Sequence, residues 1–520
     1  MKKISDDLYN LIKELNKSEK AYFKKYSKLF SSDDTAYLEL FNAIEKQVKK
    51  KNDYREDEIK TSLKNRNILK QFPVAKTKLY NQVIKNAVHY NFDNTDDSKL
   101  HYLIGGIILL YNKTLFEQAE KLLTRAKKFA KETENFLRLY QLLQWEKNLI
   151  LQNESDNAHE KFNKIYKEEK YCIEALGEAS AIKNIYCRAA AILQLWGHNR
   201  PGKGIQEFKK LMEEPVMKSD GDKLKAFSHK TFFYDIFVQY AAYTRDFESY
   251  YNYTHKSYKL FETYPHQKKK RVIDYVLTFN NLLAGCLYMK NFSMYKRTMA
   301  EYEQFIKTEK RMNTGYLKML DVLLRKHDLI FYNASGRFTE GAKYLEEYIK
   351  KVYEQNVDAD ARELNLINYF ASLLYFGNGD YSKALEYANM IINQGEPEQR
   401  KEIFLAAKII CIIIHYELGN MEYMESVIRS CYRYLLSREL EYKFEKYMIG
   451  FFKKSLDITD GRKMREHVEE CRRKIQKFRN DPLEIPGLFY FDYDAWLESK
   501  IINKTYAEII LKKNEVTQSE

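Results

Sequence analysis

The stretch of sequence closest to a catalytic loop is Gly197–Gly204, which reads GHNRPGKG. It departs from the phosphate-binding pattern GxxxxGK[ST] only at Gly204, where a serine or threonine would contact magnesium. Such a loop has to follow a strand and open a helix, whereas the preceding residues, Ala189–Trp196, continue a helical pattern. We therefore interpret Gly197–Gly204 as a turn between helices and predict no nucleotide site.

A second candidate for chemistry is the pair His467 and Cys471, four residues apart on a predicted helix. Structural zinc sites have three or four ligands, and the neighbouring residues here are mostly arginine and lysine. The sequence contains no HExxH or GxSxG motif. These observations predict a non-enzymatic protein with no metal, no cofactor and no small-molecule substrate.

The composition favours helices. The 520 residues include 43 tyrosines and 30 phenylalanines but only 18 glycines and 7 prolines. Six scattered cysteines without a CxxC pair predict free thiols in a reducing cytoplasm. There is no apolar run near the roughly 20 residues that a membrane helix needs, and no leader-like segment. We expect an all-α cytoplasmic protein that does not bind membranes.

A repeated phrase organises the chain: an apolar helix, a short turn, an aromatic or methionine anchor, and a second amphipathic helix. The anchors are Phe116, Phe247, Phe292, Phe338, Tyr381 and Met421. The last five lie 45, 46, 43 and 40 residues apart. The 131 residues from Phe116 to Phe247 are predicted to hold three units, with turns near 153–156 and 197–204. A glycine or asparagine in each turn is expected to take left-handed backbone, and the anchor to fill the hairpin.

The pattern predicts a right-handed α-solenoid of TPR-like helical hairpins over residues 96–480. Residues 1–95 read as a basic N-terminal domain of five amphipathic helices, at 6–15, 19–30, 35–49, 56–64 and 74–90, with Ser18 as an N-cap. Two prolines interrupt the pattern after 481. Residues 481–520 are predicted to form a capping helix that begins near Asp492 and a frayed tail after Asn514.

Four phrases carry a family resemblance. They are LNKSEKAYF at 15–23, LYNQVIK at 79–85, HYELGN running on to RSCYRYL within 415–435, and FDYDAWLESK at 491–500. In this order they resemble an uncharacterised family of TPR-like helical-repeat proteins of the Bacteroidota. The resemblance implies a helical array in a bacterial cytoplasm. It implies no reaction, ligand or functional residue.

Peptide binding is the common role of such arrays. Polar residues that interrupt the apolar inner helices could hold a peptide backbone, or could satisfy a local carbonyl or face solvent; they are Asn280, Asn281, Asn365 and Asn368. The asparagine of the TPR carboxylate clamp would fall eight residues before each anchor. Those positions are all apolar (Ala284, Ile330, Leu373 and Ile413), so we do not predict that clamp. The favoured interpretation is a scaffold or adaptor that binds a protein or peptide.

The distribution of charge supports an alternative function, in which basic faces bind nucleic acid or the ribosome. Residues 1–95 contain 20 basic and 13 acidic side chains, and residues 429–480 contain 15 and 8, so each segment carries +7 and together they equal the net +14 of the chain. Exposed basic faces suit acidic protein, RNA or the ribosome, or confer only solubility. The candidates in the second segment are Arg429, Arg433, Arg462, Arg465, Arg472 and Arg473. In the first segment, a helix-turn-helix interpretation would place Lys76, Lys78, Asn81, Gln82 and Lys85 on a nucleic-acid-binding helix.

Overall fold

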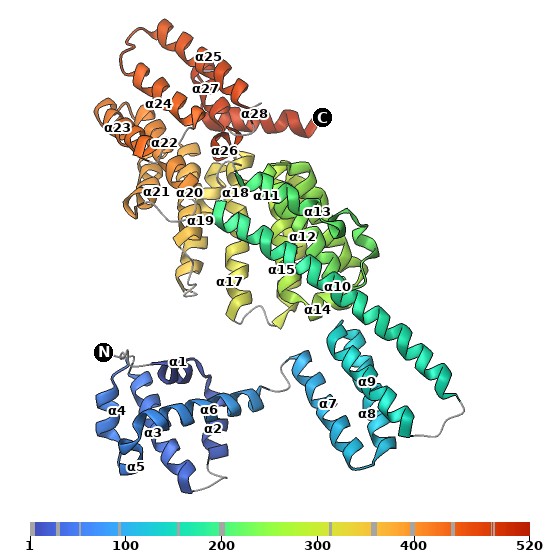
Figure 1. Cartoon of the computed structure of the whole chain (residues 1–520). Coiled ribbons are helices and arrows are strands. Elements are labelled where there is room, and N and C mark those ends of the chain that lie inside the picture. The colour runs from blue at the N-terminus through green and yellow to red at the C-terminus, as the bar shows by residue number, and fades with distance from the viewer. Residues whose placement is uncertain are drawn as a thin grey trace. The chain divides into compact units, whose positions relative to one another are not determined.

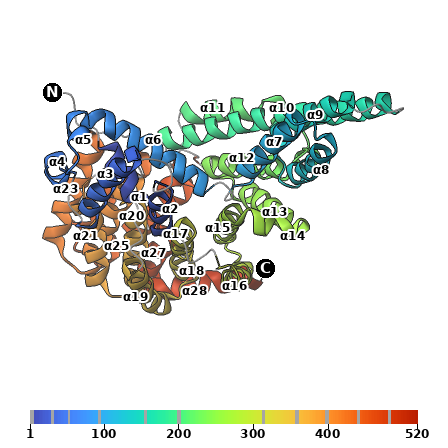
Figure 2. The ribbon, with the colours of Figure 1, turned by 90° about the horizontal axis from the view of Figure 1, so that it is seen from below.

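The structure is a computed structural model, and it describes residues 6–27, 32–50, 54–91, 95–152, 157–196, 203–310, 315–354, 361–395, 401–437, 442–479, 481 and 484–519. All regular structure in these ranges is helical and none is strand, which confirms the all-α prediction (Figures 1 and 2). The chain divides into two compact units, Met1–Leu176 and Gly177–Glu520. In the described ranges, no helix combines the length and the apolarity needed to cross a membrane. The predicted boundaries near 95 and 480 remain predictions.

The N-terminal helices form a small cluster with its own core. They are α1 (Asp7–Glu14), α2 (Lys17–Ser27), α3 (Ser32–Lys49), α4 (Glu56–Ser62), α5 (Arg66–Lys70) and α6 (Phe72–Tyr90). Helix α6 packs on α1, α2 and α3, around buried Ile12, Phe41 and Leu79. The predicted N-cap Ser18 is wrong, because α2 begins at Lys17, two residues before the predicted start of the helix. Asn16 caps it: the Glu19 amide donates to Asn16 Oδ1 at 2.9 Å, and the Asn16 amide donates to Glu19 Oε2 at 2.8 Å.

The next helices are α7 (Asp96–Asn112), α8 (Phe116–Glu132), α9 (Phe136–Gln152) and α10 (Ala158–Trp196). The regular hairpin spacing expected after Phe116 does not continue here. Helices α7, α8 and α9 have 17 residues each, but α10 is a single helix of 39 residues, within which the two units meet. The turns expected at 153–156 and at most of 197–204 lie outside the described residues.

The second unit repeats the hairpin. It contains α11 (Lys203–Met212), α12 (Phe227–Thr244), α13 (Phe247–Thr263), α14 (Pro265–Lys270), α15 (Val272–Tyr288), α16 (Phe292–Thr308), α17 (Gly315–Leu324), α18 (Lys326–Ser335), α19 (Phe338–Glu354), α20 (Ala361–Gly377), α21 (Tyr381–Asn393), α22 (Lys401–Glu417), α23 (Met421–Ser437), α24 (Lys443–Ser455) and α25 (Gly461–Phe478), with two short 3₁₀ turns, Pro215–Lys218 and Gly221–Lys223. Consecutive helices pack in pairs, α12 on α13, α15 on α16, α18 on α19, α20 on α21 and α22 on α23 (Figure 1).

The six predicted turns are all present, and each anchor is the first residue of the second helix. Two residues before each anchor, one residue has a positive φ: Thr114, Arg245, Lys290, Gly336, Gly379 or Gly419. The expected glycine therefore occurs in three turns, and the other three use a residue with a side chain. The hydrogen bonds are those of a Schellman turn, as where the Asp380 amide donates to Tyr375 O at 2.9 Å and the Gly379 amide to Phe376 O at 3.1 Å.

The anchors do not all fill their hairpins. Phe292 and Phe338 are buried, as predicted, and Phe116, Phe247 and Tyr381 are half-buried. The prediction is wrong for Met421, whose side chain is 45% exposed. The uniformly buried position comes three residues after the anchor, at Ala119, Tyr250, Tyr295, Gly341, Ala384 and Met424. A Cβ atom on Gly341 would lie 2.7 Å from Tyr332 Cβ of α18, so at that hairpin the two helices approach too closely for a side chain.

The C-terminal residues form three helices, α26 (Ile485–Leu488), α27 (Tyr493–Ile502) and α28 (Tyr506–Ser519), at the end of the chain marked C in both views (Figures 1 and 2). Asp492 caps α27, where the Ala495 amide donates to its Oδ1 at 2.9 Å. This confirms the predicted helix start, and Trp496 and Leu497 are buried. Asn503 has a φ of 53° and separates α27 from α28. Helix α28 continues to Ser519, where a frayed tail was expected after Asn514.

The unequal burial of the anchors gives a stability prediction. Phe338→Ala removes a ring that is 3% exposed, so we expect a loss of about 3–5 kcal/mol. Met421→Ala alters the equivalent position of another hairpin, but the side chain is 45% exposed, and we expect a loss of about 0.5 kcal/mol. Urea unfolding with hydrogen exchange over each hairpin measures both. Equal losses in the two variants would contradict the assignment of Phe338 to the hairpin core.

Candidate functional site

The described residues of the second unit form a groove of about 690 Å³. One side is formed by α13, α15, α18 and α20, and the other by Arg479, residues 488–494 and α28. Aromatic and aliphatic side chains make most of its walls. Three of the positions that lie eight residues before an anchor, Ala284, Ile330 and Leu373, line it. The fourth, Ile413, is fully buried in the core.

Three polar side chains line this groove, and two of them, His327 and Asn280, contact each other. Asn280 lines it from α15, and His327 and Asn333 line it from α18. His327 Nε2 lies 3.0 Å from Asn280 Oδ1. Burial, with Lys326 adjacent, lowers the pKa of His327 to about 3, so the imidazole is neutral. Nε2 must then carry the hydrogen that Asn280 Oδ1 accepts, and Nδ1 is an acceptor.

Two acceptor atoms of these side chains have no donor in the described part of the chain. They are His327 Nδ1 and Asn333 Oδ1, both buried. The other end of the Asn333 amide is fixed, because Nδ2 donates to Leu329 O at 2.9 Å and to Phe370 O at 3.1 Å. The groove is thus lined by two side chains that each contain a buried acceptor without a donor, among mostly apolar walls, and a few polar groups in an apolar hollow are the usual composition of a ligand site.

The four predicted asparagines do not share this site. Asn280 lines the groove, but Asn281 lines a separate, smaller pocket. Asn365 is 3% exposed, with Oδ1 buried and unpartnered, and Asn368 is half-buried; neither lines the groove. Sequence reasoning missed His327 and Asn333. The available signal was that both interrupt the apolar face of the helix that contains Ile330.

The C-terminal wall of the groove is bound firmly to the repeat helices. The Phe489 ring lies 5.7 Å from that of Phe247 and 5.6 Å from that of Tyr288, and the Arg245 guanidinium lies over it at 5.3 Å. Further along, Trp496 Nε1 and Lys500 Nζ both donate to the Glu417 carboxylate at 2.6 Å. Because these partners are distant in sequence, the wall depends on the tertiary structure of the whole unit.

Asp494 joins this wall to α25 and α28. Its carboxylate pairs with Arg472 at 2.8 Å and with Lys513 at 2.8 Å, and Arg472 also pairs with Glu498 at 2.6 Å. Burial acts to raise the pKa of Asp494, but hydrogen bonds and charge from Arg472 and Lys513 outweigh it and hold the pKa below the usual range. Arg472, predicted as a partner-binding residue, thus holds the C-terminal helices in place.

The other predicted arginines lie on α23 and α25. Arg429 pairs with Glu425 at 3.9 Å, and Arg465 pairs with Glu469 at 3.2 Å. Arg433, Arg462 and Arg473 are exposed. They make no ion pair within the described residues, so the uncompensated positive charge of this segment rests partly on them.

On the N-terminal helix α6, Lys76 pairs with Glu56 at 3.1 Å and donates to Tyr54 Oη at 2.8 Å, which ties it to α4. The other predicted residues of α6 differ in exposure: Lys78, Asn81 and Lys85 are exposed, and Gln82 is half-buried. A short helix, α5, occupies the expected turn before α6.

The two candidate motifs of the sequence are residues 197–204 and the pair His467 and Cys471. Residues 197–202 are outside the described ranges, but helix α10 precedes them, as predicted, and α11 begins at Lys203. His467 Nε2 contacts Phe451 O at 3.1 Å, and its ring stacks on the Phe451 ring at 4.6 Å. Burial raises the pKa of the Cys471 thiol to about 12. No three metal-binding side chains of the described residues come together.

The chain matches no protein-family model, and no curated protein is significantly similar to it in sequence. The family resemblance of the four phrases therefore remains a prediction. The structure shows that the described residues are all-helical and that consecutive helices pack in pairs.

The Asp494 contacts give a pH-dependent prediction. Asp494→Asn should cost about 1–3 kcal/mol at pH 7, because it weakens charge-assisted hydrogen bonds in a side chain that is 8% exposed. The folded pKa lies below the unfolded value of about 3.9, so this contribution is complete above about pH 5 and declines as the pH falls below about 4. Urea unfolding of both proteins from pH 7 to pH 3.5 measures the difference.

A matched control is Glu469→Gln, which also removes a carboxylate paired with an arginine of α25 but is 44% exposed. We expect a loss below about 0.5 kcal/mol for this variant. An Asp494→Asn effect that is no larger, or that grows as the pH falls, would contradict the role given to Asp494.

Proposed function

We propose that this chain is a non-enzymatic interaction protein, a right-handed α-solenoid of TPR-like hairpins that binds a short segment of a partner protein in the groove. The observation that carries the proposal is the groove itself, in which His327 and Asn333 of α18 each contain an acceptor without a donor in the described residues, among aromatic walls. Its volume of about 690 Å³ lies within the roughly 300–1,000 Å³ of typical ligand sites. It accommodates a few side chains of a peptide rather than a folded domain.

The chemistry of the groove favours an extended peptide. His327 Nδ1 and Asn333 Oδ1 need hydrogen-bond donors, and an extended backbone supplies N–H groups at regular intervals. Apolar side chains of such a peptide would pack on walls such as Phe370 and Phe489. Exposed Lys290 and Arg479 at the rim would favour acidic residues beside the apolar ones.

Selection from a displayed random-peptide library tests this proposal. We expect peptides with apolar residues flanked by acidic ones, and at least tenfold weaker binding to Ile330→Asp, which places a carboxylate on the groove wall. The control, Ile273→Asp, makes the same change at a residue that is 42% exposed on α15 and does not line the groove. It should bind the peptides like the original protein, as measured by fluorescence anisotropy.

The results of this selection decide whether peptides bind in the groove. Peptides that bind the original protein and Ile273→Asp but not Ile330→Asp, with both variants folded by circular dichroism, support the groove. Peptides that bind both variants equally, or a library that yields no specific binder, would overturn it.

The nucleic-acid or ribosome alternative rests on Arg433, Arg462 and Arg473, which are exposed and make no ion pair with another described residue. Phosphate contacts release counterions, so binding through these residues should weaken steeply as salt rises. We expect weak binding to single-stranded RNA at low salt that is lost near physiological salt, and that is reduced further when the three arginines are replaced by glutamate. Filter binding across a salt series measures it. RNA binding that survives physiological salt would favour the alternative over the peptide groove.

A further inference from the structure

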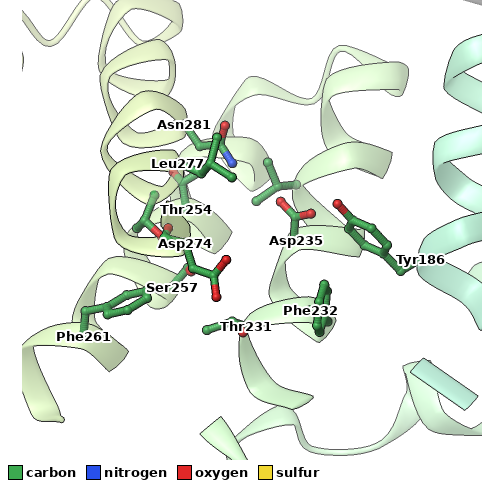
Figure 3. A pocket seen from close by; sticks show the side chains of 12 residues that line it. Tyr186, Thr231, Phe232, Asp235, Thr254, Ser257, Phe261, Asp274, Leu277 and Asn281 are labelled. Carbon is green, nitrogen blue, oxygen red and sulfur yellow. The ribbon is translucent and has the colours of Figure 1, made fainter. Parts of the chain in front are cut away.

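A second hollow, of about 100 Å³, lies among α10, α12, α13 and α15 (Figure 3). We call it the acid pocket, because Asp235 of α12 and Asp274 of α15 both line it. Tyr186 and Phe232 supply aromatic walls. An apolar cavity of about 150 Å³ holds benzene in another protein, so this pocket has room for about four or five heavy atoms.

Asp235 lacks a positive partner. Its carboxylate accepts one hydrogen bond, from Gln239 Nε2 at 2.9 Å, and no lysine, arginine or histidine of the described residues lies within 4.0 Å. Among the described residues, the cationic partner of Asp274 is Arg271, at 3.6 Å. Figure 3 shows both carboxylates directed into the pocket. Burial raises the pKa of Asp235 to about 6, and the neighbouring Asp274 charge adds to the effect. Two carboxylates facing one small pocket favour a cation between them.

The hydroxyl groups of the pocket strengthen this inference independently. Three threonines already donate their hydrogens to backbone carbonyls: Thr231 to Ser228 O at 3.0 Å, Thr254 to Tyr251 O at 2.8 Å and Thr278 to Asp274 O at 2.9 Å. Their oxygens remain as acceptors. Beside Asp235, Gln239 Oε1 is a buried acceptor with no donor in the described part of the chain. Only Tyr186, Ser257 and Asn281 keep donors among the polar lining residues. The pocket therefore has many acceptors and few donors.

We propose that the acid pocket binds a compact organic cation, a guanidinium or an alkylammonium group. A guanidinium has four heavy atoms and five or more N–H donors, which suits the volume, the two carboxylates and the threonine oxygens. The Lys183 ammonium already lies over the Phe232 and Tyr186 rings, at 4.4 and 4.8 Å, so the carboxylates and hydroxyl oxygens, and not the ring faces, are the groups that would bind the cation. Both a free small cation and the end of an arginine or lysine side chain carry this chemistry. The proposal does not depend on peptide binding in the groove, because the acid pocket has its own lining residues.

The test compares methylguanidinium chloride with N-methylurea, which has nearly the same shape but no charge. We expect saturable binding of methylguanidinium by isothermal titration calorimetry, and at least tenfold weaker binding of N-methylurea. Asp235→Asn and Asp274→Asn should each weaken methylguanidinium binding at least tenfold. Glu248→Gln, which removes an exposed carboxylate of α13 outside the pocket, should leave it unchanged.

The source of the cation is distinguished by a second arm. Agmatine represents a free metabolite, and a capped arginine peptide represents a protein side chain; tighter binding of one identifies the source, and either result supports the site. Circular dichroism and thermal melting confirm that each variant is folded. Equal binding of methylguanidinium and N-methylurea, retention of binding in Asp235→Asn, or displacement of methylguanidinium by equimolar sodium, potassium or calcium would overturn the proposal.

Discussion

The repeat depends on one backbone constraint, the left-handed residue that ends the first helix of each hairpin. This residue sits two positions before the anchor in all six predicted turns, so the second helix always starts at the same distance from the end of the first. Helices of 17 residues recur on both sides of these turns, as in α15, α16, α20, α22 and α23. At 1.5 Å per residue they are about 25 Å long, and equal lengths let neighbours pack from end to end. The buried position three residues after the anchor follows from the same geometry.

The sequence predicts these turns because the change from an apolar helix to an amphipathic one is visible around each anchor. What it does not reveal is which residue accepts the left-handed backbone. A non-glycine residue in that conformation costs of order 1 kcal/mol, a small amount beside the packing of two 17-residue helices. Arg245 and Lys290 therefore take the left-handed backbone where glycine or asparagine was expected. The same holds for Glu134, which turns α8 into α9 with the Asn135 amide donating to Ala130 O at 2.9 Å, a turn that sequence reasoning missed.

The candidate site could be predicted only in part, for a different reason. Polarity within an apolar helix identified Asn280, and the eight-residue offset identified groove-facing positions such as Ile330. The opposite wall comes from the C-terminal helices, held by contacts such as Asn514 Nδ2 donating to Ala334 O at 2.9 Å across 180 residues of sequence. No local pattern encodes such a contact. For the same reason Arg472 looked available for a partner, although Asp494 and Glu498 neutralise it.

Helix α15 separates the groove from the acid pocket and also connects them. Adjacent residues of a helix point about 100° apart, so Asn280 reaches the groove while Asn281 reaches the acid pocket. Their side chains are joined, because Asn280 Nδ2 donates to Asn281 Oδ1 at 3.2 Å, and Asn280 Oδ1 accepts from His327. A cation bound in the acid pocket would attract Asn281 Oδ1 and so compete with Asn280 for this atom. A donor bound to His327 Nδ1 would act on the other end of the same series of hydrogen bonds. Any free energy by which one ligand alters the binding of the other must be equal in both directions. His327, Asn280 and Asn281 thus form a continuous series of hydrogen bonds that runs from the groove to the acid pocket.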